Sequence, residues 1–326
     1  MASDSPTRHS QGLRWAASLA LVALCSWLLA RDLDWRAVAA GFSTARYGWV
    51  LVGGLCIVAT FFTRARRWQM LLQQPRIRLR PVMTALLVGQ ALNMALPMRG
   101  GDVARAAWIG RRRTPEVARA LASVAVEKAW DLLALLACCL ALLAVVPLPA
   151  WFARSAWGAA ATLALVALSF WAVLHWRSTL FHWAERLLAR LPAVWSHALL
   201  PHLDRAIDGL ESLRRPDLAA RVALWTALTW ALGGLANLVV LAAFGIPSPG
   251  AALFLLAALM AGAAIPLSIP GQLGVFEGIC VASLALFGVP RGEALAVGLA
   301  LHAVVMGPAL LAAALLVVTG GAGERA

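Results

Sequence analysis

Long apolar stretches recur along this chain, and they constrain its fold more than any other feature. A helix that crosses a bilayer needs about 20 apolar residues at a rise of about 1.5 Å per residue. Stretches close to this length occur at residues 13–30, 47–63, 118–146, 156–174, 222–244 and 295–319. With 62% hydrophobic and only 13% charged residues, the chain cannot cover a water-facing surface. The sequence therefore predicts an all-α polytopic membrane protein.

The basic charge of the chain lies mostly between these stretches. The formal net charge is +13, and the cations are 27 arginines and one lysine. Short arginine runs beside apolar spans are typical of cytoplasmic loops that face anionic headgroups, so we expect no nucleic-acid partner. The five cysteines all lie within apolar stretches, which predicts neither a disulfide framework nor a cysteine-type zinc site.

Two further apolar segments are interrupted. Residues 82–98 contain the polar Gln90 and Asn93 and end in a Pro-Met-Arg-Gly-Gly-Asp run, and residues 251–289 contain a Pro- and Gly-rich run at 266–274. Proline removes a helix donor and glycine permits sharp bends, so we expect both segments to fold back within the membrane as re-entrant helical hairpins. A hairpin at residues 82–98 also keeps the arginine-rich segments on both sides of it in the cytoplasm.

The expected organisation is about six transmembrane helices plus two re-entrant helical hairpins in an inverted repeat, an arrangement common among alternating-access carriers. A cytoplasmic N-terminal tail (residues 1–12), a transmembrane domain (13–320) and a C-terminal tail (321–326) follow one another, with both termini cytoplasmic. Residues 175–221 form an amphipathic cytoplasmic insertion of the kind that lies in the membrane interface. Its four histidines match no standard ligand spacing, so no metal is expected.

Charged residues within an apolar span are informative, because each costs about 2.5–3.5 kcal/mol at a helix centre. Glu127 and Asp131 lie four residues apart and share one helix face, whereas Lys128 points in another direction. We expect Arg99 and Arg105 to be the partners of these acids. The cluster either contributes to substrate binding or only fixes the first hairpin to the bundle, and the sequence leaves both roles open.

The first hairpin ends in the run from Arg99 through Asp102 to Arg105, which contains two adjacent glycines. Paired glycines let a headgroup approach backbone donors, and arginine binds phosphate with two hydrogen bonds. No Gly-Lys-Ser/Thr follows, so this is not a Walker loop. The alternative is a cytoplasmic turn whose arginines only set the topology.

Glu277 follows the second Pro-Gly run, which contains Gly271, and has no basic neighbour in the sequence. A buried Glu277 could carry a proton, or it could pair with an arginine of the other hairpin. His302 is a candidate substrate-binding residue, although a core histidine with a hydrogen-bond partner is the simpler interpretation. Gln90 and Asn93 are candidate lining residues. The sequence shows no catalytic triad or metalloenzyme motif, so we expect neither an enzyme nor a cofactor.

Taken together, these motifs resemble the flippase-like family, also called the lysylphosphatidylglycerol synthase transmembrane region. The residues that carry the resemblance are Arg66-Arg67-Trp68, Gly89-Gln90-Ala91-Leu92-Asn93, Pro97-Met98-Arg99-Gly100-Gly101-Asp102-Val103-Ala104-Arg105, Val126-Glu127-Lys128-Ala129-Trp130-Asp131, Ser268-Ile269-Pro270-Gly271-Gln272-Leu273-Gly274-Val275-Phe276-Glu277, Gly288-Val289 and His302. The resemblance runs over nearly the whole chain.

The resemblance implies an integral protein of the bacterial inner membrane that moves a phospholipid or lipid-linked headgroup between leaflets. Its expected partners are an anionic phospholipid or a polyisoprenoid-linked lipid, and an oligomer is possible. Two-part members, the multiple peptide resistance factors, add a soluble synthase domain. Because this chain ends at Ala326, we expect a stand-alone member without synthase activity. Departures from the family pattern at residues 128–131 and 268–270 leave the headgroup preference open.

Two other functions remain as alternatives at this stage. One is an accessory protein or enzyme of polyisoprenoid or hopanoid lipid metabolism, a pathway association that the resemblance also implies. The other is a secondary transporter of small solutes, which would share the inverted repeat and the broken helices.

Overall fold

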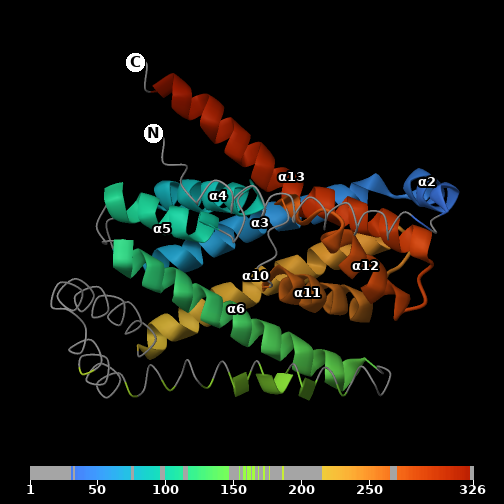
Figure 1. Cartoon of the computed structure of the whole chain (residues 1–326), viewed down its shortest axis with the longest axis horizontal. Helices are drawn as coiled ribbons and strands as arrows, with labels where there is room; N and C mark the ends of the chain where they lie inside the picture. Colours follow the sequence, from blue (N-terminus) through green and yellow to red (C-terminus); the bar gives the residue numbers. More distant parts are fainter. Residues whose placement is uncertain are drawn as a thin grey trace, which may run out of the picture. The chain divides into compact units, whose positions relative to one another are not determined.

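The computed structural model describes residues 31, 34–74, 77–95, 100–112, 117–146, 215–264 and 270–323, and single positions between 154 and 186. The elements are α2 (Trp35–Thr44), α3 (Tyr47–Leu71), α4 (Leu79–Ala95), α5 (Gly100–Arg112), α6 (Val117–Val145), α10 (Pro216–Ala243), α11 (Pro249–Ala264), the 3-10 turn η3 (Pro270–Gln272), α12 (Val275–Ala285) and α13 (Arg291–Gly323) (Figure 1). The described part of the chain contains helices and no strand, which confirms the predicted all-α class.

Four of these helices are long and apolar enough to cross a membrane: α3, α6, α10 and the Arg291–Ala312 part of α13. They coincide with four of the predicted spans, so the chain is a polytopic membrane protein. Residues 13–30 lie outside the described residues, and residues 156–174 are described only at single positions. The N-terminal tail and most of the insertion at 175–221 also lie outside, and the total number of spans stays a prediction.

The two interrupted segments contain helices that are shorter than a full span. Helices α11 and α12 have 16 and 11 residues. At a rise of about 1.5 Å per residue they are about 24 and 16 Å long, whereas the hydrocarbon core is about 30 Å thick. In the first segment, α4 runs unbroken through Gln90 and Asn93 as far as Ala95, so these polar residues do not interrupt the helix. The re-entrant arrangement of either segment stays a prediction.

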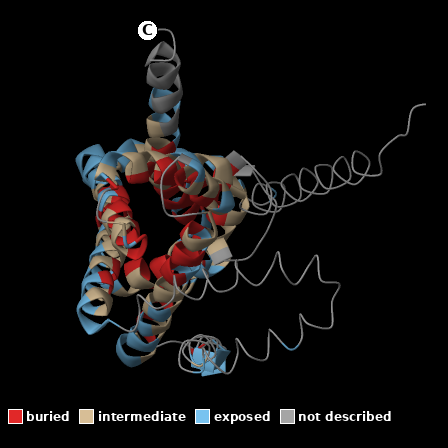
Figure 2. Ribbon diagram, turned by 90° about the vertical axis from the view of Figure 1, so that its left-hand side faces the viewer, coloured by how far each residue is buried: buried red, intermediate tan, exposed pale blue. Residues whose placement is uncertain are grey.

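The described residues form two compact units, and α3, α4, α5 and α10 each contribute residues to both. Of the described residues, the first unit contains those up to Val58, from Leu87 to Gly101 and from Leu232 onward, and the second contains those from Ala59 to Leu86 and from Asp102 to Ala231. In the first unit α12 packs against α11 and α13, and α13 packs against α2. The described helices carry buried residues on one side and exposed residues on the other (Figure 2).

The short helix α2 is stabilised by an N-terminal cap and by packing against α13. Asp34 caps the helix by accepting the backbone N–H of Arg36 at 2.9 Å. Val38 of this helix is buried against Leu295 and Ala296 of α13, and Phe42 packs against the same cluster. The capped helix therefore packs on α13 through apolar side chains.

Gly101 allows α5 to begin directly against α4. A Cβ atom at this position would overlap the carbonyl oxygen of Gly89 and would lie 2.8 Å from the backbone nitrogen of Asn93. Neither backbone atom can move away easily, so only glycine fits. The close approach also brings Asn93 beside the first turn of α5, where its buried Oδ1 has no hydrogen-bond partner among the described residues.

Replacement of Gly101 by alanine should therefore destabilise the protein, by about 1–3 kcal/mol if the helices can shift and by more if they cannot. Gly54 of α3 is the matched control, because a Cβ atom there meets nothing within 4 Å. Alanine at 54 should leave stability unchanged or slightly raised. Thermal unfolding of both variants in detergent measures the difference. Equal melting temperatures for the two variants would contradict the close approach of α4 and α5.

Candidate functional site

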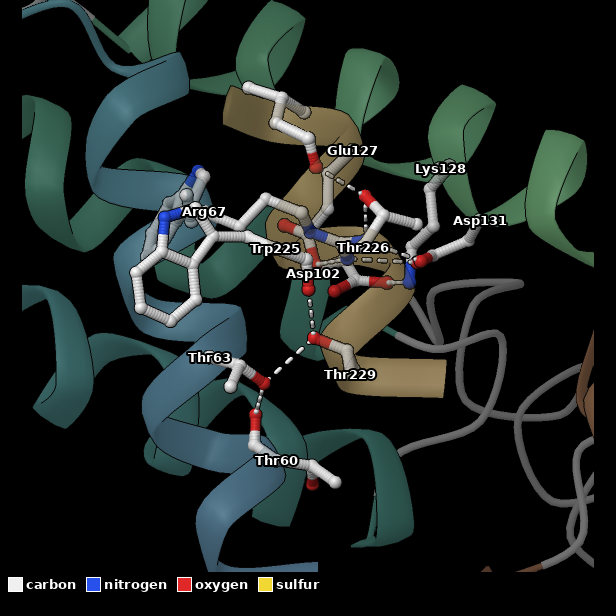
Figure 3. Close-up of polar contacts among 12 residues, drawn as sticks. Thr60, Thr63, Arg67, Asp102, Glu127, Lys128, Asp131, Trp225, Thr226 and Thr229 are labelled. Carbon is white, nitrogen blue, oxygen red and sulfur yellow. Dashed lines mark hydrogen bonds and ion pairs between the residues drawn. The ribbon is translucent and has the colours of Figure 1, made fainter. Parts of the chain in front are cut away.

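Arg67 is the centre of a buried charge network in the second unit (Figure 3). Its Nη1 donates to Asp131 Oδ1 at 2.7 Å and to Thr226 Oγ1 at 3.1 Å. Its Nη2 donates to Glu127 Oε1 at 3.1 Å and to Asp131 Oδ2 at 3.2 Å. The paired contacts with Asp131 use the fork geometry in which guanidinium matches a carboxylate. One arginine thus joins α3 to α6 and α10.

Glu127 connects Arg67 to a second buried arginine. Its Oε2 lies 3.0 Å from Arg105 Nη1, and the side chains of Glu127 and Arg105 are 0% and 2% exposed. Arg105 Nε also donates to Asp102 Oδ1 at 3.0 Å, one turn earlier on α5. Burial of an isolated carboxylate costs several kcal/mol, and an arginine on each side of Glu127 offsets that cost.

Lys128, Asp102 and Asp131 form the accessible edge of the network. Lys128 Nζ lies 3.2 Å from Asp102 Oδ2, and their side chains are 44% and 19% exposed. Asp131 is 31% exposed. The three cations and three carboxylates of the network are Arg67, Arg105, Lys128, Asp102, Glu127 and Asp131. Their charges cancel, which allows them to lie together among apolar helices.

Asp102 and Arg105 lie on α5, which is not among the helices apolar and long enough to span. Burial alone would raise the pKa of Asp102, but the charges of Lys128 and Arg105 outweigh it and hold the pKa below its usual value. Burial alone would lower the pKa of Arg105, but the carboxylates of Glu127 and Asp102 raise it. Both side chains are therefore charged at neutral pH.

Trp68 of α3 fixes the orientation of Arg105. The guanidinium carbon of Arg105 lies 4.5 Å from the centroid of the indole ring, within the range of a cation–π interaction. The fully buried indole donates its Nε1–H to Ser123 Oγ at 2.9 Å, and this hydroxyl donates to the carbonyl of Ala120 at 2.7 Å. Arg105 is therefore positioned by an aromatic surface as well as by two carboxylates.

Hydroxyl groups continue the polar contacts away from Arg67. The hydroxyls of Thr63 on α3 and Thr229 on α10 lie 2.7 Å apart. Thr63 also contacts the carbonyl of Thr60 at 3.0 Å, one turn earlier on α3 (Figure 3). These contacts link α3 and α10 without any charge.

The structure brings four predicted site residues into one network: Asp102, Arg105, Glu127 and Asp131. The predicted pairing of Arg105 with Glu127 is confirmed. Asp131, however, is bound by Arg67, and Arg99 lies outside the described residues. Arg67 is a site residue that the sequence did not predict, because it follows Arg64 and Arg66 in a short arginine run beside an apolar span, which is typical of a cytoplasmic flank.

A signal in the sequence could have identified Arg67. Thr60, Thr63 and Arg67 have spacings of three and four residues, so they lie on one face of a helix. A polar stripe that crosses an otherwise apolar span and ends in an arginine indicates a buried partner. Thr226 carried no comparable signal, since a threonine can bond to its own helix backbone, as it does here with the carbonyl of Val222 at 2.8 Å.

The first unit contains a second buried ionisable pair, Glu277 of α12 and His302 of α13. Glu277 Oε1 lies 2.5 Å from His302 Nδ1, and its Oε2 accepts the backbone N–H of Gly274 at 2.8 Å. The His302 ring also stacks on Phe276, with 4.7 Å between the centroids. His302 is thus a buried histidine with a partner, as its simpler interpretation held. Among the described residues the side-chain partner of Glu277 is this histidine rather than an arginine.

The loop before α12 has an unusual backbone. Gly271 has a φ of 62° and Gln272 a φ of 56°, both in the left-handed region that disfavours residues with a Cβ atom. Glu277 holds the end of this loop through the N–H of Gly274. The other predicted lining residues, Gln90 and Asn93, lie on α4 in the first unit, so they are not part of the charge network of the second unit.

Comparison with known families agrees with this architecture. The family model described as "Lysylphosphatidylglycerol synthase TM region" matches residues 15–313, a range that includes the charge network and the Glu277–His302 pair. This confirms the resemblance that the sequence motifs suggested. No curated protein matches the chain.

Loss of the Arg67 guanidinium should destabilise the fold strongly. In Arg67→Leu the carboxylates of Glu127 and Asp131 lose a shared buried partner, and breaking such a pair costs about 3–5 kcal/mol. Arg67→Lys should lie between this variant and the wild type, because an ammonium keeps the charge but cannot form the paired contacts. The exposed Arg111 is the control, and its change to leucine should alter stability by no more than about 0.5 kcal/mol. Denaturation in detergent ranks the four proteins, and similar stability of the two leucine variants would exclude the central role of Arg67.

Glu277→Ala should destabilise the first unit by about 1–3 kcal/mol, because it leaves the buried His302 ring and the Gly274 N–H without their acceptor. Glu293, exposed in the first turn of α13, is the matched control. Alanine at 293 removes only a favourable helix-dipole interaction of about 0.3–1 kcal/mol. Thermal unfolding followed by amide hydrogen exchange tests both variants. Exchange at Gly274 that is no faster in Glu277→Ala than in Glu293→Ala would contradict the assigned contact.

Proposed function

This chain belongs to the family of lysylphosphatidylglycerol synthase TM regions, and we propose that it moves a phospholipid or lipid-linked headgroup between the leaflets of its membrane. Its family and its apolar helices make it a membrane-embedded, lipid-related protein. The arginine distribution supports an orientation with both termini in the cytoplasm, and we place the chain in a bacterial inner membrane, as the family resemblance implies.

The observation that carries the proposal is the buried charge network. Ionisable groups within membrane helices are expensive and usually mark the path of a polar substrate. Here six of them meet on α3, α5 and α6, and three are partly accessible. A lipid headgroup is the polar substrate that this family suggests, and it needs such a polar path because its acyl chains keep it in the bilayer.

In the proposed mechanism, ion pairs exchange partners as the headgroup enters. Arg105, together with Arg99, which directly precedes α5 in the sequence, contacts the headgroup phosphate. The buried Nη2 of Arg105 has no hydrogen-bond partner among the described residues, so it is available to an additional acceptor. Glu127 and Asp131 keep the arginines oriented or contact a cationic part of the headgroup. Exchange between paired states avoids an isolated charge at any stage.

The second ionisable pair supports a related task in the other interrupted segment. Glu277 pairs with His302 and accepts the backbone N–H of Gly274, at the end of the loop in which Gly271 has a left-handed backbone. We assign these residues to the outer hairpin, where they would shape the second end of the lipid path. This assignment follows the predicted inverted repeat, in which broken helices occupy matching places in the two halves.

Leaflet exchange in proteoliposomes tests the proposal. Purified protein is reconstituted with a fluorescent phosphatidylglycerol, and dithionite bleaches the label in the outer leaflet only. Wild-type vesicles should lose nearly all fluorescence, whereas protein-free vesicles should keep about half. Glu127→Gln should slow the exchange by at least about tenfold, because it leaves a buried arginine charge without one of its partners.

The control for this assay is Glu293→Gln, which changes an exposed carboxylate of α13 and should exchange lipid like the wild type. Thermal unfolding of both variants separates loss of transport from loss of folding. Exchange in wild-type vesicles no faster than in protein-free vesicles would reject leaflet transport of this lipid. Equal rates for the wild type and Arg99→Ala would reject the role assigned to Arg99.

A further inference from the structure

Lys128 is the only lysine in a chain that contains 27 arginines, and it lies in the charge network. It follows Glu127 directly on α6, yet its ammonium turns to Asp102 of α5 at 3.2 Å. Its side chain is 44% exposed, whereas the two arginines of the network are almost completely buried. Among the described cations of the network, Lys128 is therefore the one that a ligand can reach first.

The two arginines also have more partners than Lys128, although the Nη2 of Arg105 has none among the described residues. Arg67 makes four hydrogen bonds, to Asp131, Glu127 and Thr226. Arg105 is held between two carboxylates and the Trp68 ring. An ammonium has three donors, and Lys128 has one described acceptor. Its remaining donors and its exposure leave room for a second acceptor.

Asp102 makes an exchange at Lys128 possible without leaving a buried charge unpaired. Its Oδ2 contacts Lys128, and its Oδ1 accepts from Arg105 Nε at 3.0 Å. When an anion takes the place of Asp102 at Lys128, Asp102 keeps Arg105 as its partner. The same anion would lie close to Arg105, whose buried Nη2 lacks a hydrogen-bond partner among the described residues. An anion at this place would therefore meet two kinds of donor, the flexible ammonium of Lys128 and the buried guanidinium of Arg105.

We propose that Lys128 is the first cation of this network to contact the ligand and binds a phosphate ester by displacing the carboxylate of Asp102, with Arg105 as the second donor. The inference rests on the proposed function in taking the phosphate to be that of a lipid headgroup. A lysine suits this exchange, because its ammonium is a point charge on a flexible stem. An arginine would grip Asp102 with two hydrogen bonds and release it less readily. The two arginines then keep the network assembled while Lys128 changes partner.

The single lysine makes the proposal directly measurable, since the full chain has only one other primary amine, at its N-terminus. Purified protein is treated with an acetylating N-hydroxysuccinimide ester, and mass spectrometry follows modification of Lys128 and of the N-terminus separately. The reaction is run in maltoside detergent, in detergent with millimolar inorganic phosphate, and in nanodiscs of phosphatidylglycerol or of an uncharged galactolipid. Lys128→Arg serves as the blank.

Labelling of Lys128 should be about tenfold slower in phosphatidylglycerol than in galactolipid, the factor that one charge-assisted hydrogen bond supplies. The N-terminal amine should react equally in both. Protection by inorganic phosphate as well would show that any phosphate source is accepted, and protection by the lipid alone would show that the acyl chains are required. Equal rates in the two kinds of nanodisc, or an unreactive Lys128 in every medium, would overturn the proposal.

Asp102→Asn provides a second, more specific test. Removal of the competing carboxylate should lower the phosphate concentration, or the fraction of phosphatidylglycerol in mixed nanodiscs, that gives half-protection of Lys128. Asp217→Asn changes an exposed carboxylate in the first turn of α10 and should leave that concentration unchanged. A purely structural Lys128–Asp102 pair predicts no gain in protection for Asp102→Asn, and this result would overturn the exchange. Thermal unfolding confirms that both variants are folded.

The labelling assay and the leaflet-exchange assay test the two proposals separately. Protection of Lys128 without leaflet exchange would retain the phosphate site and reject transport of that lipid. Leaflet exchange without protection of Lys128 would retain transport and reject this residue as the contact. The two results together therefore assign each failure to one proposal.

Discussion

Neutralisation of buried charge is the constraint on which the second unit depends. Glu127 is fully buried on α6, and its two carboxylate oxygens contact Arg67 of α3 and Arg105 of α5. Removal of either arginine would leave one oxygen of this carboxylate without its partner, in surroundings that cannot solvate it. Since Arg67 also binds Thr226 of α10, the requirement to keep one carboxylate paired holds four helices in a defined register. Apolar packing in lipid is less directional, because lipid tails are as apolar as the side chains.

The residues of the network differ in burial, and this difference suits the buried ones to holding the helices together and the partly exposed ones to binding. Its inner members, Arg67, Arg105 and Glu127, are each paired with a buried opposite charge and are almost completely buried. Its outer members are partly exposed and share partners with the inner ones. A site built this way can change partners at its edge while its centre stays assembled. The question whether these charges fix the helices or bind substrate therefore does not require a single answer, because different residues suit the two tasks.

The first unit also contains a buried carboxylate, but its partners are of another kind. Glu277 is satisfied by a histidine and by a backbone N–H instead of by arginines. Its contact with Gly274 ties the carboxylate to the loop before α12, in which Gly271 and Gln272 have left-handed backbones. Each unit thus contains a buried carboxylate with a side-chain partner on a neighbouring helix. The inverted repeat stays a prediction.

The sequence by itself determined the fold class, the positions of the long apolar helices and the presence of costly charges within them. These properties follow from helix length, hydropathy and residue spacing, which are local. It also identified Glu127, Asp131, Asp102 and Arg105 as members of one site, since each is a charge in or beside an apolar span. Only the tertiary structure decided how the charges pair: Arg67 with Asp131, Lys128 with Asp102, and Glu277 with His302. Pairing depends on which helix faces meet and how deeply each side chain is buried. An arginine run such as 64–67 therefore looks uniform in sequence, although one of its members is the centre of a network in space.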